Sequence, residues 1–231
     1  MPSFREQLET AERWRRFPAL ERVDGARLAL TFDDGPDPDA TTGVLDALAE
    51  AGTRATFFLV GEQVDAHPSL AAEVAARGHV VGLHGYLHVE HNELADPRSD
   101  LERGAAALAA ATGERPALFR PPYGRFSAAS FAACRELGFA PVYWSAWGSD
   151  WEPIPAGRIA DLVIRDIAPG VIVLLHDSAR YAYRESARAT AEALPRVLEA
   201  VAAAGLELVT VGGRHSAGAR RRRRWLGRGR G

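Results

Sequence analysis

Two adjacent carboxylates and two closely spaced histidines are the residues of this sequence best suited to chemistry. Asp33 and Asp34 follow the apolar run LALTF and precede Gly-Pro, and His84 and His88 lie four residues apart. On one helical turn that spacing brings both imidazoles to the same side, and a carboxylate from the first strand end could complete a three-ligand site. Two histidines, one carboxylate and an open position suit a zinc-like ion that activates water or polarises a carbonyl. His91 could compete as a ligand, but we expect it to be a solvated loop residue.

Hydrolysis at such a site also needs a proton acceptor and a proton donor. One acid of the adjacent pair is expected to bind the ion, and the other to take a proton from water. His176 ends the apolar run VIVLLH and suits protonation of the leaving group, because a nearby carboxylate would hold its tautomer and raise its pKa. The alternative is a core histidine whose ring is satisfied by a backbone carbonyl.

Short β-rich runs alternate with helical stretches along the body of the chain. The runs span residues 27–33, 55–60, 79–84, 117–121, 140–146, 171–176 and 206–211. The stretches between them are rich in Ala, Leu, Glu and Arg at helical spacing, and most stop at glycine, as helix C-termini prefer. Alternation of strand and helix with short connections favours parallel strands with helices outside. We predict an α/β fold, a distorted (β/α)7 barrel with parallel strands, with an open doubly wound sheet as the alternative.

The polar residues singled out above share one position in this pattern. Five of the predicted strands are followed at their C-terminal ends by Asp33 and Asp34, by His84 and His88, by Arg120 and Tyr123, by Asp150 and Trp151, and by His176 and Asp177. The C-terminal rim of a parallel α/β barrel is where reactive residues gather. The elements therefore predict that these side chains converge on one site.

Composition and charge limit the class of protein. The 231 residues are 47% hydrophobic, enough for a substantial core, and the single cysteine, Cys134, excludes a disulfide framework and reads as a packed helix residue. Residues 214–231 contain eight arginines and no acid, which leaves 20 basic and 30 acidic residues in the rest. We predict that this Gly- and Arg-rich tail is disordered.

The two ends are expected to lie outside the catalytic domain. Residues 1–26 are predicted to be a helical arm, residues 27–213 the barrel and residues 214–231 the tail. The tail is expected to contact an anionic membrane or an acidic polymer, with a solvated extension as the alternative. No specific nucleic-acid recognition is expected, and we predict a monomer. Since no run reaches the roughly 20 apolar residues of a membrane span and no signal peptide is recognisable, a cytoplasmic or membrane-associated location is expected.

The ordered motifs TFDDG, HGYLH, RPPYG, SDW and LLHD resemble the five signature motifs of the NodB-homology polysaccharide deacetylases, carbohydrate esterase family 4. The resemblance covers residues 27–213. It implies a distorted seven-stranded barrel that uses a divalent metal, most often Zn²⁺ with Co²⁺, Ni²⁺ or Mn²⁺ as alternatives, to remove N-acetyl or O-acetyl groups from sugars. An acetylated glycan is the implied substrate.

The resemblance also implies a role for each motif residue. Asp33 would be the general base, and Asp34, His84 and His88 the metal ligands. Arg120 would orient Asp33, and Asp150 would orient the general acid His176. The implied substrate-binding residues are Pro122, Tyr123, whose amide would help to hold the oxyanion, Trp151 as a groove wall, and Leu174 beside the acetyl methyl.

Two positions depart from the family pattern. Gly85 stands where the family usually has Ser or Thr, whose hydroxyl braces the metal loop, and Trp147 stands where an acid is frequent. These departures keep three readings open: an N-acetyl deacetylase, an O-acetyl sugar esterase and a catalytically silent sugar-binding barrel. A further reading makes the chain mainly a binder of anionic surfaces through its tail. The presence of Asp33 and His176 favours an enzyme, because binding alone needs neither a base nor an acid.

Overall fold

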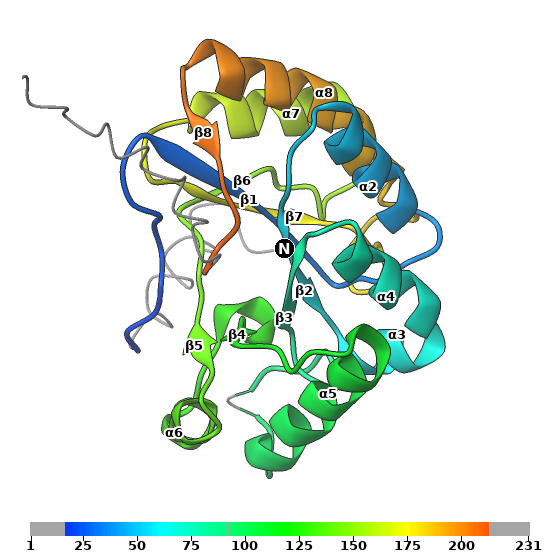
Figure 1. Cartoon of the computed structure of the whole chain (residues 1–231), viewed down its shortest axis with the longest axis vertical. Helices are drawn as coiled ribbons and strands as arrows, with labels where there is room; N and C mark the ends of the chain where they lie inside the picture. The colour runs from blue at the N-terminus through cyan, green and yellow to red at the C-terminus, as the bar shows by residue number, and fades with distance from the viewer. Residues whose placement is uncertain (1–16, 92, 213–231) are drawn as a thin grey trace, which may run out of the picture.

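The computed structural model describes residues 17–91 and 93–212 as a curled parallel sheet with helices packed on its outer face (Figure 1). The strands are β1 (Arg27–Asp33), β2 (Thr56–Leu59), β3 (Val80–Leu83), β4 (Leu118–Phe119), β5 (Ala140–Pro141), β6 (Ala146–Trp147), β7 (Ile172–His176) and β8 (Glu207–Leu208). The helices are α2 (Thr41–Glu50), α3 (Gly61–Ala66), α4 (Pro68–Ala76), α5 (Pro97–Thr112), α6 (Ala128–Glu136), α7 (Ala156–Arg165) and α8 (Arg188–Ala203), with a 3-10 turn η1 (Pro122–Gly124).

The order of the strands confirms the predicted fold class. It runs β5-β4-β3-β2-β1-β7-β6, all neighbours are parallel, and β8 pairs with the start of β1. The helices form an arc around the outside of this sheet, from α7 and α8 past α2 to α5 and α6 (Figure 1). Strands β1 to β5 are thus neighbours in chain order around a distorted barrel.

One of the predicted strands is divided in the structure. The run 140–146 forms two short strands, of which β5 pairs with β4 and β6 pairs with β7. Between them the chain bends. The Tyr143 N–H donates to the carbonyl of Leu20 at 2.8 Å, and the Leu20 N–H donates to the carbonyl of Pro141 at 2.9 Å. A single segment therefore supplies the strands at both ends of the strand order. Its partners, β4 and β7, lie too far away in sequence for a local pattern to predict the division.

The alternation of β1 decides which of its residues reach the site. Leu28, Leu30 and Phe32 are fully buried in the large core beneath the helices, whereas Ala29 packs in a smaller cluster with Phe58 and Ile172. Because neighbouring residues of a strand point to opposite faces, Thr31 and Asp33 follow Ala29 to the inner face. Asp33 is therefore carried inside the curl by the same periodicity that buries Phe32 outside it.

Helix α5 begins and ends at residues that suit these positions. Asp96 caps it by accepting the Ser99 N–H at 3.0 Å, Pro97 occupies the first turn, and Gly113 ends it in the left-handed conformation with φ of 80°. These caps fix where α5 meets the loop after β3.

Residues 1–16 of the predicted helical arm 1–26, and the predicted tail 214–231, lie outside the described residues. Residues 17–26 contain no helix, and they form isolated bridges from Leu20 to Val142 and from Arg22 to Val171. Within residues 17–91 and 93–212, no helix is both long and apolar enough to cross a membrane. Cys134 is buried in α6, as predicted.

Candidate active site

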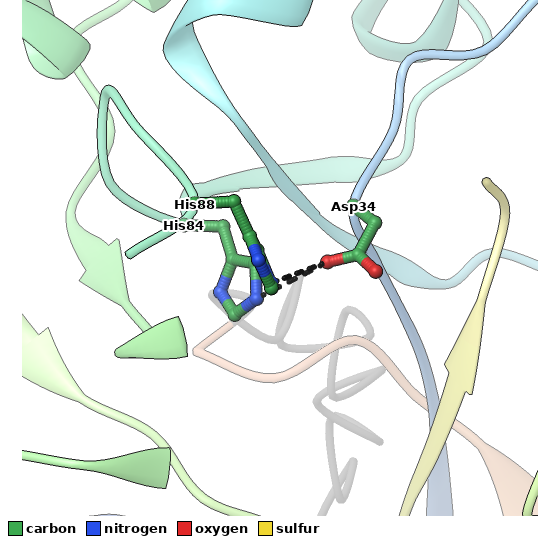
Figure 2. Close-up of side chains that lie close together, drawn as sticks. All are labelled: Asp34, His84 and His88. Carbon is green, nitrogen blue, oxygen red and sulfur yellow. Dashed lines mark ion pairs between the residues drawn. The ribbon is translucent and has the colours of Figure 1, made fainter. Parts of the chain in front are cut away.

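Asp34, His84 and His88 converge at the C-terminal edge of the sheet (Figure 2). Asp34 lies just beyond β1 with φ of 79°, His84 follows β3, and His88 lies in the loop after it. Oδ1 of Asp34 is 3.1 Å from Nε2 of His88 and 3.4 Å from Nε2 of His84. One ligand atom from each residue lies within 4.8 Å of the others, so the three side chains can share one ion.

The polarity of these atoms fits a cation. Nδ1 of His84 lies 2.7 Å from the carbonyl oxygen of Arg120, so an N–H at Nδ1 donates to that oxygen, and in this tautomer Nε2 has the lone pair that can bind a metal ion. That lone pair faces Oδ1 of Asp34, which accepts no well-directed hydrogen bond from the described residues. Nε2 of His84 and Oδ1 of Asp34 are both electron-rich, and a divalent metal ion bound by both atoms would account for their close approach.

His88 is held between two tyrosine rings. Tyr181, from the loop after β7, stacks on its imidazole with ring centroids 4.1 Å apart and an interplanar angle of 10°. Tyr123 meets the same imidazole edge-on at 4.7 Å. Tyr181 is anchored in turn, since its hydroxyl donates to Glu62 at 2.5 Å and accepts from Gln63 at 3.1 Å. These contacts restrict the imidazole before any ligand is bound.

Arg120 orients Asp33. The guanidinium is fully buried and donates from Nη1 to Oδ1 of Asp33 at 2.6 Å and to Oγ1 of Thr31 at 2.8 Å, and from Nη2 to the carbonyl of Tyr143 at 2.9 Å. It also lies 4.1 Å above the ring of Phe58. The other oxygen of Asp33 is 3.7 Å from Nε2 of His84, so this carboxylate lies beside the group of Asp34, His84 and His88 without belonging to it.

His176 lies beside Asp33 in the sheet and is paired with Asp150. The strand register sets Asp33 opposite His176, and Oδ1 of Asp150 is 2.9 Å from Nδ1 of the imidazole. Oδ2 of Asp150 accepts the His176 backbone N–H at 2.8 Å and the Thr190 hydroxyl at 2.7 Å. Burial lowers the pKa of His176, but the charge of Asp150 and its hydrogen bond, aided by Asp34 and Asp33, raise it to about 9. A protonated imidazole at neutral pH can donate a proton from Nε2.

The predicted substrate-side residues lie at the same edge. Tyr123 is 51% exposed with φ of 57°, while Pro122 beside it is buried. Trp151 is half-buried, with its ring edge-on to His176 at 5.7 Å, and Leu174 is buried in β7. These placements are compatible with the roles that the motifs imply for the four residues.

The structure corrects the expectation for His91. It is not a solvated loop residue, because its side chain is fully buried and its Nε2 lies 3.2 Å from Oδ2 of Asp100. The turn that follows the metal loop folds back onto α5, which the spacing of His91 from His88 could not reveal.

Several residues support the site although the sequence assigned no role to them. Arg184 donates to the carbonyl of His176 at 3.1 Å and to the Thr190 hydroxyl at 2.8 Å. Asp177 accepts the Gly35 N–H at 3.1 Å and the Thr41 hydroxyl at 2.6 Å, and a Cβ added at Gly35 would lie 2.3 Å from that carboxylate. Among these residues, only Asp177 could be connected with the site from the sequence, because it follows His176 in the motif LLHD. The other residues act through contacts between segments that are distant in sequence.

Comparisons with known proteins agree with this geometry. The family model described as polysaccharide deacetylase matches residues 21–142. Two peptidoglycan-N-acetylglucosamine deacetylases of Bacillus cereus are 34% and 35% identical to 66% and 80% of this chain, which spans 56% and 85% of their lengths. A chitooligosaccharide deacetylase of Bradyrhizobium is 37% identical over 67% of this chain and 73% of that protein.

A solved structure extends the agreement to the fold. The family 4 carbohydrate esterase of Streptomyces lividans, in complex with acetate, superposes with a TM-score of 0.71 at 33% identity, over 79% of this chain and 91% of that one. The chain therefore belongs to the polysaccharide deacetylases of carbohydrate esterase family 4.

Proposed function

We propose that this protein is a metal-dependent deacetylase that hydrolyses the N-acetyl amide of N-acetylglucosamine units in a glycan. The observation that carries the proposal is the convergence of three sets of side chains at one edge of the sheet. These are the two-histidine, one-carboxylate cluster, the Asp33 carboxylate held by Arg120, and the His176 imidazole held by Asp150. The first suits a metal ion, the second a base and the third an acid.

The residues divide the reaction between them. A divalent ion held by Asp34, His84 and His88 would supply Lewis acidity toward water and the acetyl carbonyl. Asp33, oriented by the Arg120 guanidinium, takes a proton from the attacking water. His176, charged beside Asp150, gives a proton to the amine as the carbon–nitrogen bond breaks. Water is consumed, and acetate and a free amino sugar are released.

The named relatives support the choice of substrate. The Bacillus cereus proteins act on N-acetylglucosamine of peptidoglycan and the Bradyrhizobium protein on chitooligosaccharides, as their names state. An N-acetylated amino sugar is common to both substrates. We propose zinc as the ion, since two imidazoles and a carboxylate suit it, and cobalt, nickel and manganese are the alternatives that the same donors accept.

The test is acetate release from N-acetylglucosamine oligomers by wild type, Asp33→Asn and the control Asp46→Asn, whose carboxylate is exposed on α2. Each protein is assayed after chelation and after zinc is restored. We expect zinc-dependent release by wild type and the control, and a loss of about 10²-fold or more in Asp33→Asn. Zinc binding without release from N-acetyl or O-acetyl sugars would favour the silent barrel. Release from acetylated xylan alone would favour the esterase.

The arginine-rich segment stays a separate prediction. Deletion of residues 214–231 should leave hydrolysis of short oligomers unchanged and weaken binding to vesicles that contain anionic lipid. Unchanged vesicle binding would leave the segment as a solvated extension.

A further inference from the structure

The backbone of the loop that joins His84 and His88 is held from two sides. On one side, the first residues of α3 donate to its carbonyls: the Gly61 N–H to the oxygen of Gly85 at 2.9 Å and the Glu62 N–H to the oxygen of Tyr86 at 3.0 Å. These bonds fix the carbonyl groups of the loop but leave its N–H groups to be satisfied elsewhere.

A single carboxylate satisfies the N–H groups on the other side. Oδ2 of Asp100 accepts the Tyr86 N–H at 2.9 Å, and Oδ1 accepts the Leu87 N–H at 3.0 Å. Asp100 is 9% exposed and lies in the first turn of α5, where the helix dipole favours a negative charge. Nε2 of His91, fully buried, lies 3.2 Å from Oδ2. Burial raises the pKa of Asp100, but contacts with His91, Leu87 and Tyr86 bring it below its ordinary value, so the group is ionised.

Gly85 leaves the space that this carboxylate occupies. Its φ is 85°, and a Cβ there would lie 2.9 Å from the carbonyl oxygen of Leu87, 3.1 Å from Oδ2 of Asp100 and 3.2 Å from Nε2 of His91. A serine or threonine, the usual residue of the family at this position, would displace these groups and adopt a strained backbone. A side chain at position 85 would therefore compete with the Asp100 carboxylate for this space.

We infer that Asp100, buried beside His91, is the positioning residue that braces the His84–His88 loop in place of the absent hydroxyl and thereby sets the affinity for the metal ion. This inference rests on the proposed metal-dependent function. Asp100 contacts neither a predicted metal ligand side chain nor Asp33 or His176, so it acts through the loop backbone alone.

Two substitutions follow from this arrangement. Asp100→Asn keeps the shape but replaces one acceptor by an NH2 group that faces an N–H donor, and supporting groups of this kind are worth about 10–100-fold in metal affinity. Gly85→Ser restores the residue usual in the family, yet it should also weaken metal binding, because its Cβ meets Asp100 and His91. Glu102→Gln is the matched control, since Glu102 is on the same helix but pairs with Arg98 at the surface.

The experiment uses the full chain and zinc, titrated against a chromogenic chelator, with kcat at saturating zinc and thermal stability recorded for each variant. We expect the dissociation constant for zinc to rise about 10–100-fold in Asp100→Asn and to stay unchanged in Glu102→Gln. The kcat at saturating zinc should be largely retained. In the metal-free protein, amide hydrogen exchange of the peptide containing Tyr86 and Leu87 should be faster in Asp100→Asn than in the control.

The outcomes separate this inference from the proposed function. Zinc binding by wild type with unchanged affinity in Asp100→Asn would overturn the inference and leave the function standing. Tighter binding by Gly85→Ser would also overturn it, and this variant carries the test if Asp100→Asn does not fold. Absence of zinc binding by wild type would refute the proposed function and remove the basis of the inference with it.

Discussion

Replacement of Asp150 by asparagine should move the alkaline limb of the pH–rate profile to lower pH. The active form of His176 is protonated, and the limb reports its loss of a proton as the pH rises. The charge and hydrogen bond of Asp150 are the largest influences that raise the pKa of His176 to about 9, against the lowering effect of burial. An asparagine side chain keeps the shape of the aspartate but not its charge, so the lowering effect of burial on the pKa of His176 is then offset less.

The size of the effect follows from the same geometry. The ordinary pKa of histidine is about 6.5, and a change of one in the pKa corresponds to about 1.4 kcal/mol in the free-energy difference between the protonated and neutral forms. Asp34 and Asp33 also raise the pKa of His176, and a bound metal ion would offset the charge of Asp34. We therefore assign about 1–2 units, or about 1.4–2.7 kcal/mol, to Asp150, and expect the limb to shift downward by that amount.

The assay is kcat and kcat/KM for acetate release from N-acetylglucosamine oligomers between about pH 6 and pH 10, with zinc saturating, and NMR titration of His176 gives an independent value. Thr190→Val is the matched control, because it removes a hydrogen bond to Asp150 at 2.7 Å and leaves the charge in place. Its limb should shift less than that of Asp150→Asn. An alkaline limb at the same pH in wild type and Asp150→Asn would refute the reasoning that this carboxylate raises the pKa of the acid.

Three further predictions concern stability. Arg120→Met should lower the free energy of unfolding by about 3–5 kcal/mol, because it leaves the buried Asp33 carboxylate without its partner; urea denaturation measures this, and the loss should shrink when Asp33→Asn is added. Burial lowers the pKa of His79 to about 4, so the folded state disfavours the charged ring. The contribution of His79 to the free energy of unfolding should therefore be present above about pH 6.5 and lost as the pH falls toward 4. If a His79→Gln variant loses stability equally steeply over that range, His79 is not the cause of the loss. Zinc at 100 times its dissociation constant should stabilise the fold by about 2.7 kcal/mol, reversibly on chelation, and thermal unfolding of Asp34→Asn should show no such response.

Much of the fold follows from patterns within single segments. The alternation in RLALTFD sends Phe32 to the helices and Asp33 to the inside, and the apolar run before His176 identifies a buried strand. Helix α3 and the division of the run 140–146 were not predicted. The first is only six residues long, and the second depends on β4, β7 and Leu20, which lie elsewhere in the chain.

The sequence by itself determined which residues could do chemistry and that they would meet at one edge. Asp33 and His176 end recognisable strands, Asp34 and His84 directly follow theirs, and the ends of parallel strands share one side of a sheet. The sequence was sufficient to predict where these residues lie, because their position at the end of a strand places them at this edge independently of the side chains that pack around them.

Only the tertiary structure decided how each side chain is held. Arg120 reaches Asp33 across 87 residues of sequence, and Asp150 reaches His176 across 26. The burial of His91 against Asp100 had no local signal, since it requires α5 to pack against the metal loop. The charge and orientation of a group depend on atoms within a few ångströms, and in a folded chain most of these come from distant segments.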